Sequence, residues 1–448
     1  EVNTVAPQCG TTLTLGESGD TVVLGTGASQ SGFGRNGAVN WQTTKKTTSF
    51  TAVSGEGYFC DTAASGAFTL TLPSSPSAGD IVGLKDYNGN FGSDNLTVNR
   101  NGSPLNGSST NFIAQTNNLS LTIVYVDSTE GWVSIEEGTG FVGEAFVTAT
   151  GGTVSCSGNC RIHTFTGPGT FCVSSVASCT ANNVVSYVVV AGGGGGGSVR
   201  GSGGGAGGYR EGSTNSVTPY TASPLSNPTG LTVVGTAYPI TVGAGGTGGT
   251  SCGCAANIVL GSNGGNSIFS SITSAGGGRG TSPAPSPNTA GPGGSGGGGN
   301  ENTGSGSSAG GTGNQPPVSP PQGTNGGSGV GGSNYGAGGG GGATVAGTNG
   351  DPTGGGAGGA GATSSINGTP TTRAGGGGGS VYNRPDNFGA GGSGGGGAAV
   401  AGGGNPAATA GTANTGGGGG GGYHPGNSTK EGGAAGGSGI VIIRYKYQ

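Results

Sequence analysis

Charged side chains are scarce in this chain. Lys, Arg, Asp and Glu make up 7% of its 448 residues, whereas about 25% is typical of soluble domains. The formal net charge is −4, and neither sign gathers into a long run. A surface that tracks nucleic-acid phosphates needs clustered cations, so we expect no binding to nucleic acid.

Long apolar runs and methionine are also missing. No stretch of 18 apolar residues occurs, so the sequence predicts no membrane-spanning helix. The sequence contains no Met and shows no signal peptide. We therefore expect residue 1 to be a processed or truncated start rather than the start of translation.

The residues that usually carry catalysis are few and dispersed. The two histidines, His163 and His424, are far apart, and the glycine runs lack the GK[ST] sequence of a phosphate-binding loop. The last 258 residues contain five carboxylates, too scattered to supply a glycosidase acid pair. We expect no enzyme, no cofactor and no metal site.

Eight cysteines are present: Cys9, Cys60, Cys156, Cys160, Cys172, Cys179, Cys252 and Cys254. An even number in a chain with little acid–base chemistry favours disulfides in an extracellular setting. The alternative is a zinc site, in which Cys156-x3-Cys160 would act with Cys172-x6-Cys179.

Glycine is the abundant residue, and it is unevenly distributed. It supplies 90 of the 258 residues from Ala191 onward, but only 26 of the 190 before them. The runs include 192–197, 203–208 (interrupted by Ala206), 338–342, 375–379, 394–397 and 416–422. They are contiguous rather than spaced every third residue, which excludes collagen.

An ordered glycine run has one favourable conformation, the left-handed polyproline-II helix with three residues per turn and no internal hydrogen bonds. Buried N–H and C=O groups then need partners on neighbouring helices. Ordering a glycine costs about 1–2 kcal/mol, and a net hydrogen bond returns about 0.5–1.5 kcal/mol. The sequence therefore predicts a bundle, a polyglycine-II sandwich over residues 191–448.

The part before the glycine region predicts an all-β organisation with essentially no α-helix. Residues 1–35 resemble a thin β-ribbon, and residues 36–140 a compact all-β module with alternating apolar residues and Asn-Gly turns. The expected strands of the module are Thr48–Val53, Gly57–Asp61, Ala67–Leu72, Asp80–Lys85, Asn95–Asn99, Leu119–Val126 and Gly131–Ile135.

Residues 141–190 predict a β connector that leads into the glycine region, and Ser186–Val190 runs directly into its first glycine run. The segment 439–447 closes the region with a second apolar strand. We expect these two strands to pair and to clamp the bundle at one end.

Several segments carry a specific resemblance. Tyr187–Gly197, Gly203–Tyr209, Tyr238–Gly246 and Gly436–Lys446 resemble the glycine-rich domain of tailed-bacteriophage tail fibres. Ile162–Thr170 resembles the segment that leads into that domain, and Trp41–Thr44, Phe50–Phe59 and Val124–Trp132 resemble a β module found upstream of it. No baseplate-docking segment is evident, and the cysteines exceed the family's usual number.

The resemblance implies a distal host-recognition fibre of the virion, an extracellular and generally homotrimeric assembly. Its receptor would be a bacterial surface polysaccharide or an outer-membrane protein, bound by loops at the tip of the polyglycine-II scaffold. An alternative is a secreted bacterial filament subunit or surface adhesin with a structural role.

The inserts between glycine runs hold the chemistry that such a tip would use. The expected receptor-binding residues are Tyr382, Asn383, Arg384, Asp386, Phe388, Tyr423, His424 and Tyr335. Aromatic rings with amides and a guanidinium suit an adaptive binding surface. The same residues could instead cap the ends of the glycine helices.

Overall fold

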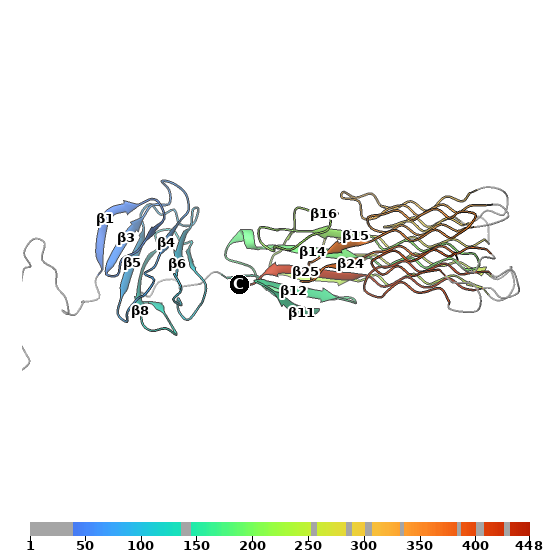
Figure 1. Ribbon diagram of the computed structural model, residues 1–448. Helices are drawn as coiled ribbons and strands as arrows, with labels where there is room; N and C mark the ends of the chain where they lie inside the picture. Colours follow the sequence, from blue (N-terminus) through green and yellow to red (C-terminus); the bar gives the residue numbers. More distant parts are fainter. Residues whose placement is uncertain are drawn as a thin grey trace, which may run out of the picture. The chain divides into compact units, whose positions relative to one another are not determined.

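The computed structural model describes residues 39–135, 145–251, 258–283, 289–300, 307–331, 336–382, 387–399, 407–424 and 431–448. The chain divides into two compact units, Glu1–Gly143 and Glu144–Gln448 (Figure 1). The described part is essentially all-β, because its only helical element is the short 3₁₀ turn η1, Thr180–Asn182. This confirms the predicted fold class, and no described helix could cross a membrane.

The first unit is built from two β-sheets. One contains β1 (Asn40–Lys46), β3 (Glu56–Cys60), β5 (Ile81–Asp86), β8 (Ser120–Tyr125) and β9 (Trp132–Ser134), in that spatial order. The other contains β2 (Phe50–Thr51), β4 (Phe68–Thr71), β6 (Leu96–Asn99) and β7 (Phe112–Ala114). From β1 to β6 the chain alternates between the sheets, so same-sheet neighbours are parallel.

The sheets of the first unit enclose an apolar core that includes Leu70, Leu84, Val98 and Trp132, all fully buried. These residues belong to the apolar alternation of the predicted strands, in which every second side chain faces the core. The sequence interpretation missed β1 and β7. β1 has the polar sequence NWQTTKK and is mostly exposed, so it lacks the apolar alternation that marks a buried strand.

The second unit begins with two more sheets. The first contains β10 (Thr148–Thr150), β13 (Gly169–Ser175), β18 (Ala237–Thr241), β21 (Ser267–Phe269) and β22 (Ile272–Ser274). The second, the clamp sheet, contains β11 (Thr153–Ser157), β12 (Cys160–Phe165), β25 (Ile440–Lys446), β14 (Val184–Val190), β15 (Tyr209–Gly212) and β16 (Ser226–Asn227), and β17 (Leu231–Thr232) also pairs with β14. Two small hairpins are β19 (Thr250–Ser251) with β20 (Ile258–Val259), and β23 (Ala362–Ser364) with β24 (Thr371–Arg373).

The opening and closing strands of the glycine region pair as the sequence predicts. β14 and β25 are antiparallel neighbours in the clamp sheet, with Val188 opposite Ile442. Residues of both strands are buried on both faces, and the two faces belong to different apolar clusters. The strands that bracket the glycine runs in sequence therefore form the centre of a two-sided core.

His163 lies in this core and is fully buried. Its Nδ1 lies 2.6 Å from the carbonyl oxygen of Gly151, and its Nε2 lies 3.1 Å from the hydroxyl of Tyr445. A carbonyl can only accept, so Nδ1 carries the proton and Nε2 accepts from the Tyr445 hydroxyl. The ring also stacks on Tyr445. His163 thus joins β12 to β25 as a neutral residue.

We predict that this histidine makes the second unit sensitive to acid. Burial lowers the pKa of His163, so the unfolded chain takes up its proton first, and stability is lost as the pH falls below about 6.5. His163→Gln should be less stable than wild type at pH 7.5 by about 1–3 kcal/mol. The difference should shrink toward pH 5 in denaturant unfolding. A pH-independent difference would contradict the neutral assignment.

Hydrogen bonds define the conformation of the glycine runs. The N–H groups of residues 192–197 donate in rotation to three neighbouring segments, and every third residue returns to the same segment. In chain order the accepting carbonyls belong to Gly265, Gly437, Gly205, Ser262, Ala434 and Ser202, at N–O distances of 2.8–3.0 Å. A helix with three residues per turn produces this rotation, so the run is a polyglycine-II rod.

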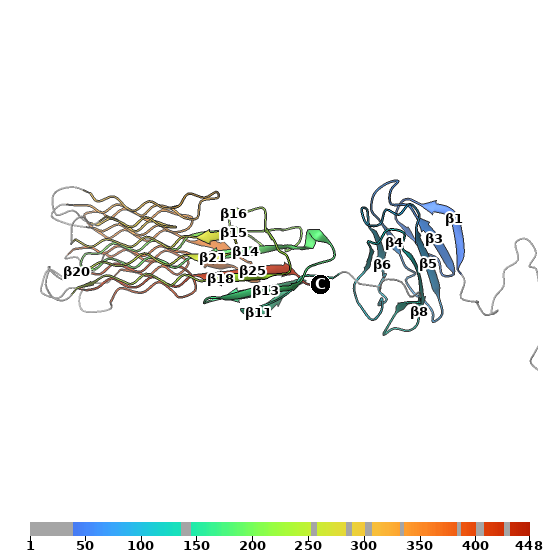
Figure 2. The same cartoon turned by 180° about the vertical axis from the view of Figure 1, so that it is seen from behind.

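The carbonyls of the same rod rotate in the same way, toward three other segments. They accept from the N–H groups of Gly277, Gly246, Gly419, Gly280, Gly249 and Gly422. The rod therefore has six neighbours, three that accept from it and three that donate to it, and every main-chain polar group between Gly192 and Gly197 is paired. Figures 1 and 2 show the rods running side by side away from the clamp sheet.

Glycine is required in these rods because there is no room for a side chain, not because the backbone adopts a φ angle that only glycine tolerates. No glycine of 192–197 has a φ in the left-handed region, but a Cβ on any of them would overlap a carbonyl of a neighbouring rod. At Gly195, for example, the Cβ would meet the carbonyl oxygen of Thr247. Backbone on both sides of the contact leaves no side chain that could move away.

We predict that Gly195→Ala destabilises the second unit by about 3 kcal/mol or more, because overpacking against main chain cannot relax. Gly235→Ala is the matched control, since a Cβ there has nothing within 4 Å. It should change stability by less than about 0.5 kcal/mol. Thermal or denaturant unfolding of the two variants measures the difference. Equal stabilities would contradict rod-on-rod packing.

The predicted disulfides are not found among the described cysteines. Cys60, Cys156, Cys160, Cys172 and Cys179 are all free thiols. The zinc alternative fails as well, because the described residues form no cluster of three His, Cys, Asp or Glu that could hold a metal ion. The prediction of disulfides therefore finds no support among the five described cysteines. Cys9, Cys252 and Cys254 lie outside the described residues.

Candidate functional site

The rods have two different ends. Residues 192–197 leave β14 and residues 201–208 return to β15, so the connection Ser198–Arg200 lies at the end of the bundle opposite the clamp sheet. The rod that ends at His424 and the rod that begins at Glu431, which leads into β25, meet at the same end. We call this end the tip, and define it by Ser198–Arg200, Ser380–Tyr382, Tyr423–His424 and Glu431.

Three side chains from distant parts of the sequence stack at the tip. The guanidinium carbon of Arg200 lies 5.0 Å from the centre of the Tyr382 ring, a cation–π distance. The Tyr382 and His424 rings follow with centroids 5.7 Å apart and planes inclined by 34°. The backbones of Tyr382 and His424 also form a parallel β-bridge. All three side chains are half-buried and therefore partly open to solvent.

A small apolar cluster lies beside this stack. Tyr423 and Val381 are 4% and 1% exposed and pack together with Ala408. The ring of Tyr423 is therefore not available for the surface contact that the sequence interpretation gave it. Neighbouring residues in an extended chain point to opposite sides, so Tyr382 and His424 face outward while Val381 and Tyr423 support them from inside.

Backbone hydrogen bonds hold the tip connections in place. The N–H of Ser198 donates to the Ser282 hydroxyl at 2.9 Å, and that of Val199 to the Glu431 carbonyl at 3.0 Å. Val199 and Arg200 both have left-handed φ values, 52° and 62°. Two consecutive non-glycine residues in this region are costly, so the surrounding bonds must hold the turn that aims Arg200 at Tyr382.

An ionised acid lies at the same end of the rods. Asp351 and Gly354 form a β-bridge with each other. Their turn packs against Gly336, which in turn forms a β-bridge with Val381. The Asp351 carboxylate accepts from the hydroxyl and the N–H of Thr353, both at 2.6 Å. These hydrogen bonds, the hydroxyl first, lower the pKa of Asp351. The described chemistry of this end is thus aromatic, amide and mixed-charge, without a nucleophile–base pair.

The predicted site residues are distributed as follows. Tyr382 and His424 come together, and Tyr423 packs beneath them. Phe388 is half-buried next to Asn387, whose amide donates to the Thr353 carbonyl. Asn383, Arg384, Asp386 and Tyr335 lie outside the described residues.

The sequence interpretation missed Arg200. The signal in the sequence was the Ser-Val-Arg segment between two glycine runs. Its Val199 and Arg200 are the only large side chains in the stretch 192–208. A bulky or charged residue between rods must lie at an end of the bundle, because the interior has no room for it. This rule would have placed Arg200 with the other inserts.

The fold and the tip define a β-clamped polyglycine scaffold with its exposed chemistry at the ends of the rods. Comparison with protein families agrees with this class, since a family model described as a glycine-rich domain matches residues 166–446. The match covers more than half of the chain, and the chain belongs to this glycine-rich domain family. A search of curated proteins found no match.

Proposed function

We propose that this protein is the distal part of a bacteriophage tail fibre, an adhesin without enzymatic activity. It would recognise a bacterial surface polysaccharide or outer-membrane protein through the tip. The proposal is supported chiefly by the stack of Arg200, Tyr382 and His424, which three separate inserts build at one end of a rigid scaffold. The resemblance of the flanking strands to tail-fibre segments supports the phage context.

The scaffold suits adhesion because it removes flexibility before binding occurs. Each inner rod is hydrogen-bonded to six neighbours, so the inserts start from fixed anchor points. A surface that is ordered beforehand loses less conformational entropy when it binds. Rigid support is also what a binding constellation needs in order to hold its geometry.

The chemistry of the stack fits a saccharide or a loop of a membrane protein. The Tyr382 ring offers an apolar face with a polar edge, and such amphipathic rings are favoured in adaptable binding surfaces. The imidazole of His424 and the guanidinium of Arg200 add hydrogen-bonding groups next to that ring. Contacts of this kind are individually weak.

Multivalency would compensate for weak individual contacts. We propose that the fibre is a homotrimer carried on the virion, so that several tips face the same cell. Linked binding sites raise the effective concentration of one another, and overall avidity can exceed the single-site affinity by about 10²–10⁴. The low charge of the second unit also limits non-specific electrostatic attachment.

The experiment that tests this function has two parts. Antibody raised against the chain should label virions, and the fluorescently labelled protein should bind intact host cells. Tyr382→Ala combined with His424→Ala should reduce cell binding at least tenfold, because the double variant removes two layers of the stack. Flow cytometry with titrated protein measures the loss.

The matched control is Tyr447→Ala. It removes a half-buried aromatic that also stacks with an arginine, Arg161, but lies just beyond β25 at the opposite end of the unit. This variant should bind cells as wild type does. Unfolding curves of all variants should coincide with that of the wild type. Cell binding that survives in the double variant, or falls equally in both, would argue against recognition at the tip.

A further inference from the structure

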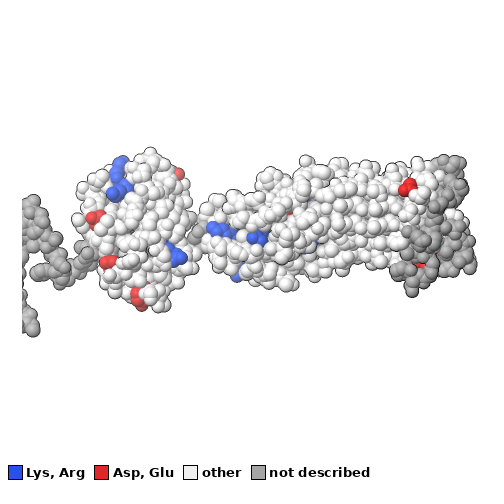
Figure 3. All heavy atoms as spheres, viewed as in Figure 1, with Lys and Arg blue, Asp and Glu red and all other residues white. Residues whose placement is uncertain are grey.

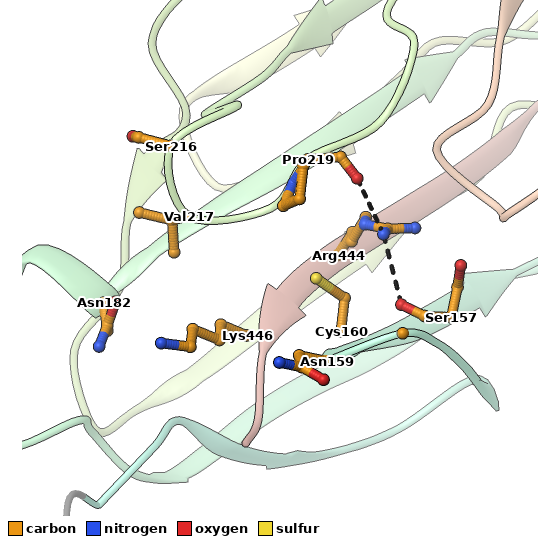
Figure 4. A pocket seen from close by; sticks show the side chains of 10 residues that line it. Ser157, Asn159, Cys160, Asn182, Ser216, Val217, Pro219, Arg444 and Lys446 are labelled. Carbon is orange, nitrogen blue, oxygen red and sulfur yellow. Dashed lines mark hydrogen bonds between the residues drawn. The ribbon is translucent and has the colours of Figure 1, made fainter. Parts of the chain in front are cut away.

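A pocket of about 410 Å³ opens at the clamp-sheet end of the second unit. Its walls come from the β11–β12 hairpin turn, η1, the loop that follows β15, and the end of β25 (Figure 4). The lining residues are Ser157, Gly158, Asn159, Cys160, Asn182, Ser216, Val217, Pro219, Arg444 and Lys446. Its size falls within the range of small-molecule sites, about 300–1,000 Å³.

The two cations of the pocket come from the strand pattern of β25. Ile440, Ile442, Arg444 and Lys446 alternate along one face of the strand, because side chains repeat every two residues. The two isoleucines fill the apolar cluster, and the two cations follow where the strand leaves it. Figure 3 shows Lys and Arg side chains gathered over this end of the unit.

The positive charge in the pocket has no acidic partner. Arg444 is only 4% exposed, and no Asp or Glu lines the pocket. Lys446 lies with its ammonium 4.9 Å from the centre of the Phe146 ring. The ion pair found within the described ranges is Lys45–Asp61, in the other unit. A buried charge without a counter-charge is unfavourable unless a ligand supplies one.

The guanidinium of Arg444 is held rigidly. Its Nη1 donates to the carbonyl of Ile366 at 3.2 Å, and its Nη2 donates to the carbonyls of Pro219 at 3.1 Å and Ser157 at 3.4 Å (Figure 4). These neutral acceptors orient the group without cancelling its charge. The Nε–H is buried and has no protein partner. A guanidinium has five N–H donors, so the Nε–H and one Nη1–H remain without a protein acceptor in a fixed orientation.

We propose that this pocket binds a hydroxylated carboxylate of the sugar-acid class, such as a hexuronate. The carboxylate would be paired with Arg444 and Lys446, since charge-assisted hydrogen bonds to carboxylates are the strong ones. Asn159 and Ser216 would bond ring hydroxyls, and Val217 and Pro219 would contact the ring's apolar face. Phosphate lacks the ring hydroxyls and the apolar ring face that these contacts would recognise, so a sugar acid should bind better than phosphate.

The experiment is calorimetric titration of the full chain with D-glucuronate. D-glucose supplies the ring without the carboxylate, acetate the carboxylate without the ring, and phosphate a different oxyanion. We expect saturable binding of glucuronate, weaker binding of acetate and phosphate, and none of glucose. Glucose or phosphate binding as tightly as glucuronate, or no glucuronate binding at millimolar concentration, would overturn the proposal.

Two variants locate the binding in this pocket. Lys446→Gln should weaken glucuronate binding about tenfold or more, the loss expected for one charged hydrogen bond. Ser216→Tyr, at an exposed loop position, should block the pocket while leaving its charge intact. Arg161→Gln is the control, because Arg161 lies on the neighbouring strand β12 and is not a lining residue. Equal binding by all three variants would contradict the assignment.

This inference does not depend on adhesion at the tip. Lys446 lies at the opposite end of the unit from Tyr382 and His424. Lys446→Gln should therefore leave cell binding unchanged if the tip is the receptor site. Loss of cell binding in Lys446→Gln with retained glucuronate binding would count against the pocket, whatever the outcome at the tip.

Discussion

The lateral hydrogen bond between neighbouring polyglycine rods is the constraint on which the second unit depends. Each inner residue donates one such bond and accepts another, and none of these bonds lies within a rod. The bonds can form only if the rods touch, and the rods can touch only where Cβ is absent. Composition, rod spacing and the absence of an ordinary side-chain core inside the bundle all follow from this one requirement.

The same bonds leave little net stability. Ordering a glycine costs about 1–2 kcal/mol, and the one bond per residue that it gains returns about 0.5–1.5 kcal/mol, with some help from Cα–H···O contacts. The rods alone are near balance. The clamp sheet supplies apolar burial that glycine cannot, because β14 and β25 are buried on both faces. The covalent continuity of β14 with the first rod and of the last rod with β25 transmits that stability to the bundle.

The features predicted correctly from the sequence are those for which only one structure satisfies the backbone and the apolar side chains. Contiguous glycines could be ordered only as laterally bonded rods, and apolar strands on both sides could be satisfied only by pairing, as β14 and β25 are. The features predicted wrongly or missed depend on contacts between segments that are distant in sequence. β1 forms from a polar segment because β3 offers it an edge. Free cysteines look the same in sequence as paired ones, and an even number of them does not establish disulfides.

At the tip, too, some single-residue features could be predicted from the sequence and others could not. Inserts between rods had to fall at the ends of the bundle, so Tyr382 and His424 could be anticipated as neighbours of a surface. The sequence could not predict which of the two adjacent aromatic residues faces outward. Tyr423 is buried, whereas His424 is half-buried. That choice is set by Val381 and Ala408, whose positions depend on how three rods align. Because rod alignment is fixed by threefold hydrogen bonding, the register of glycines far from the tip determines which side chains the tip presents. Inserting or deleting one residue within a rod would rotate the following residues by about 120°, and would therefore change the surface without altering any insert.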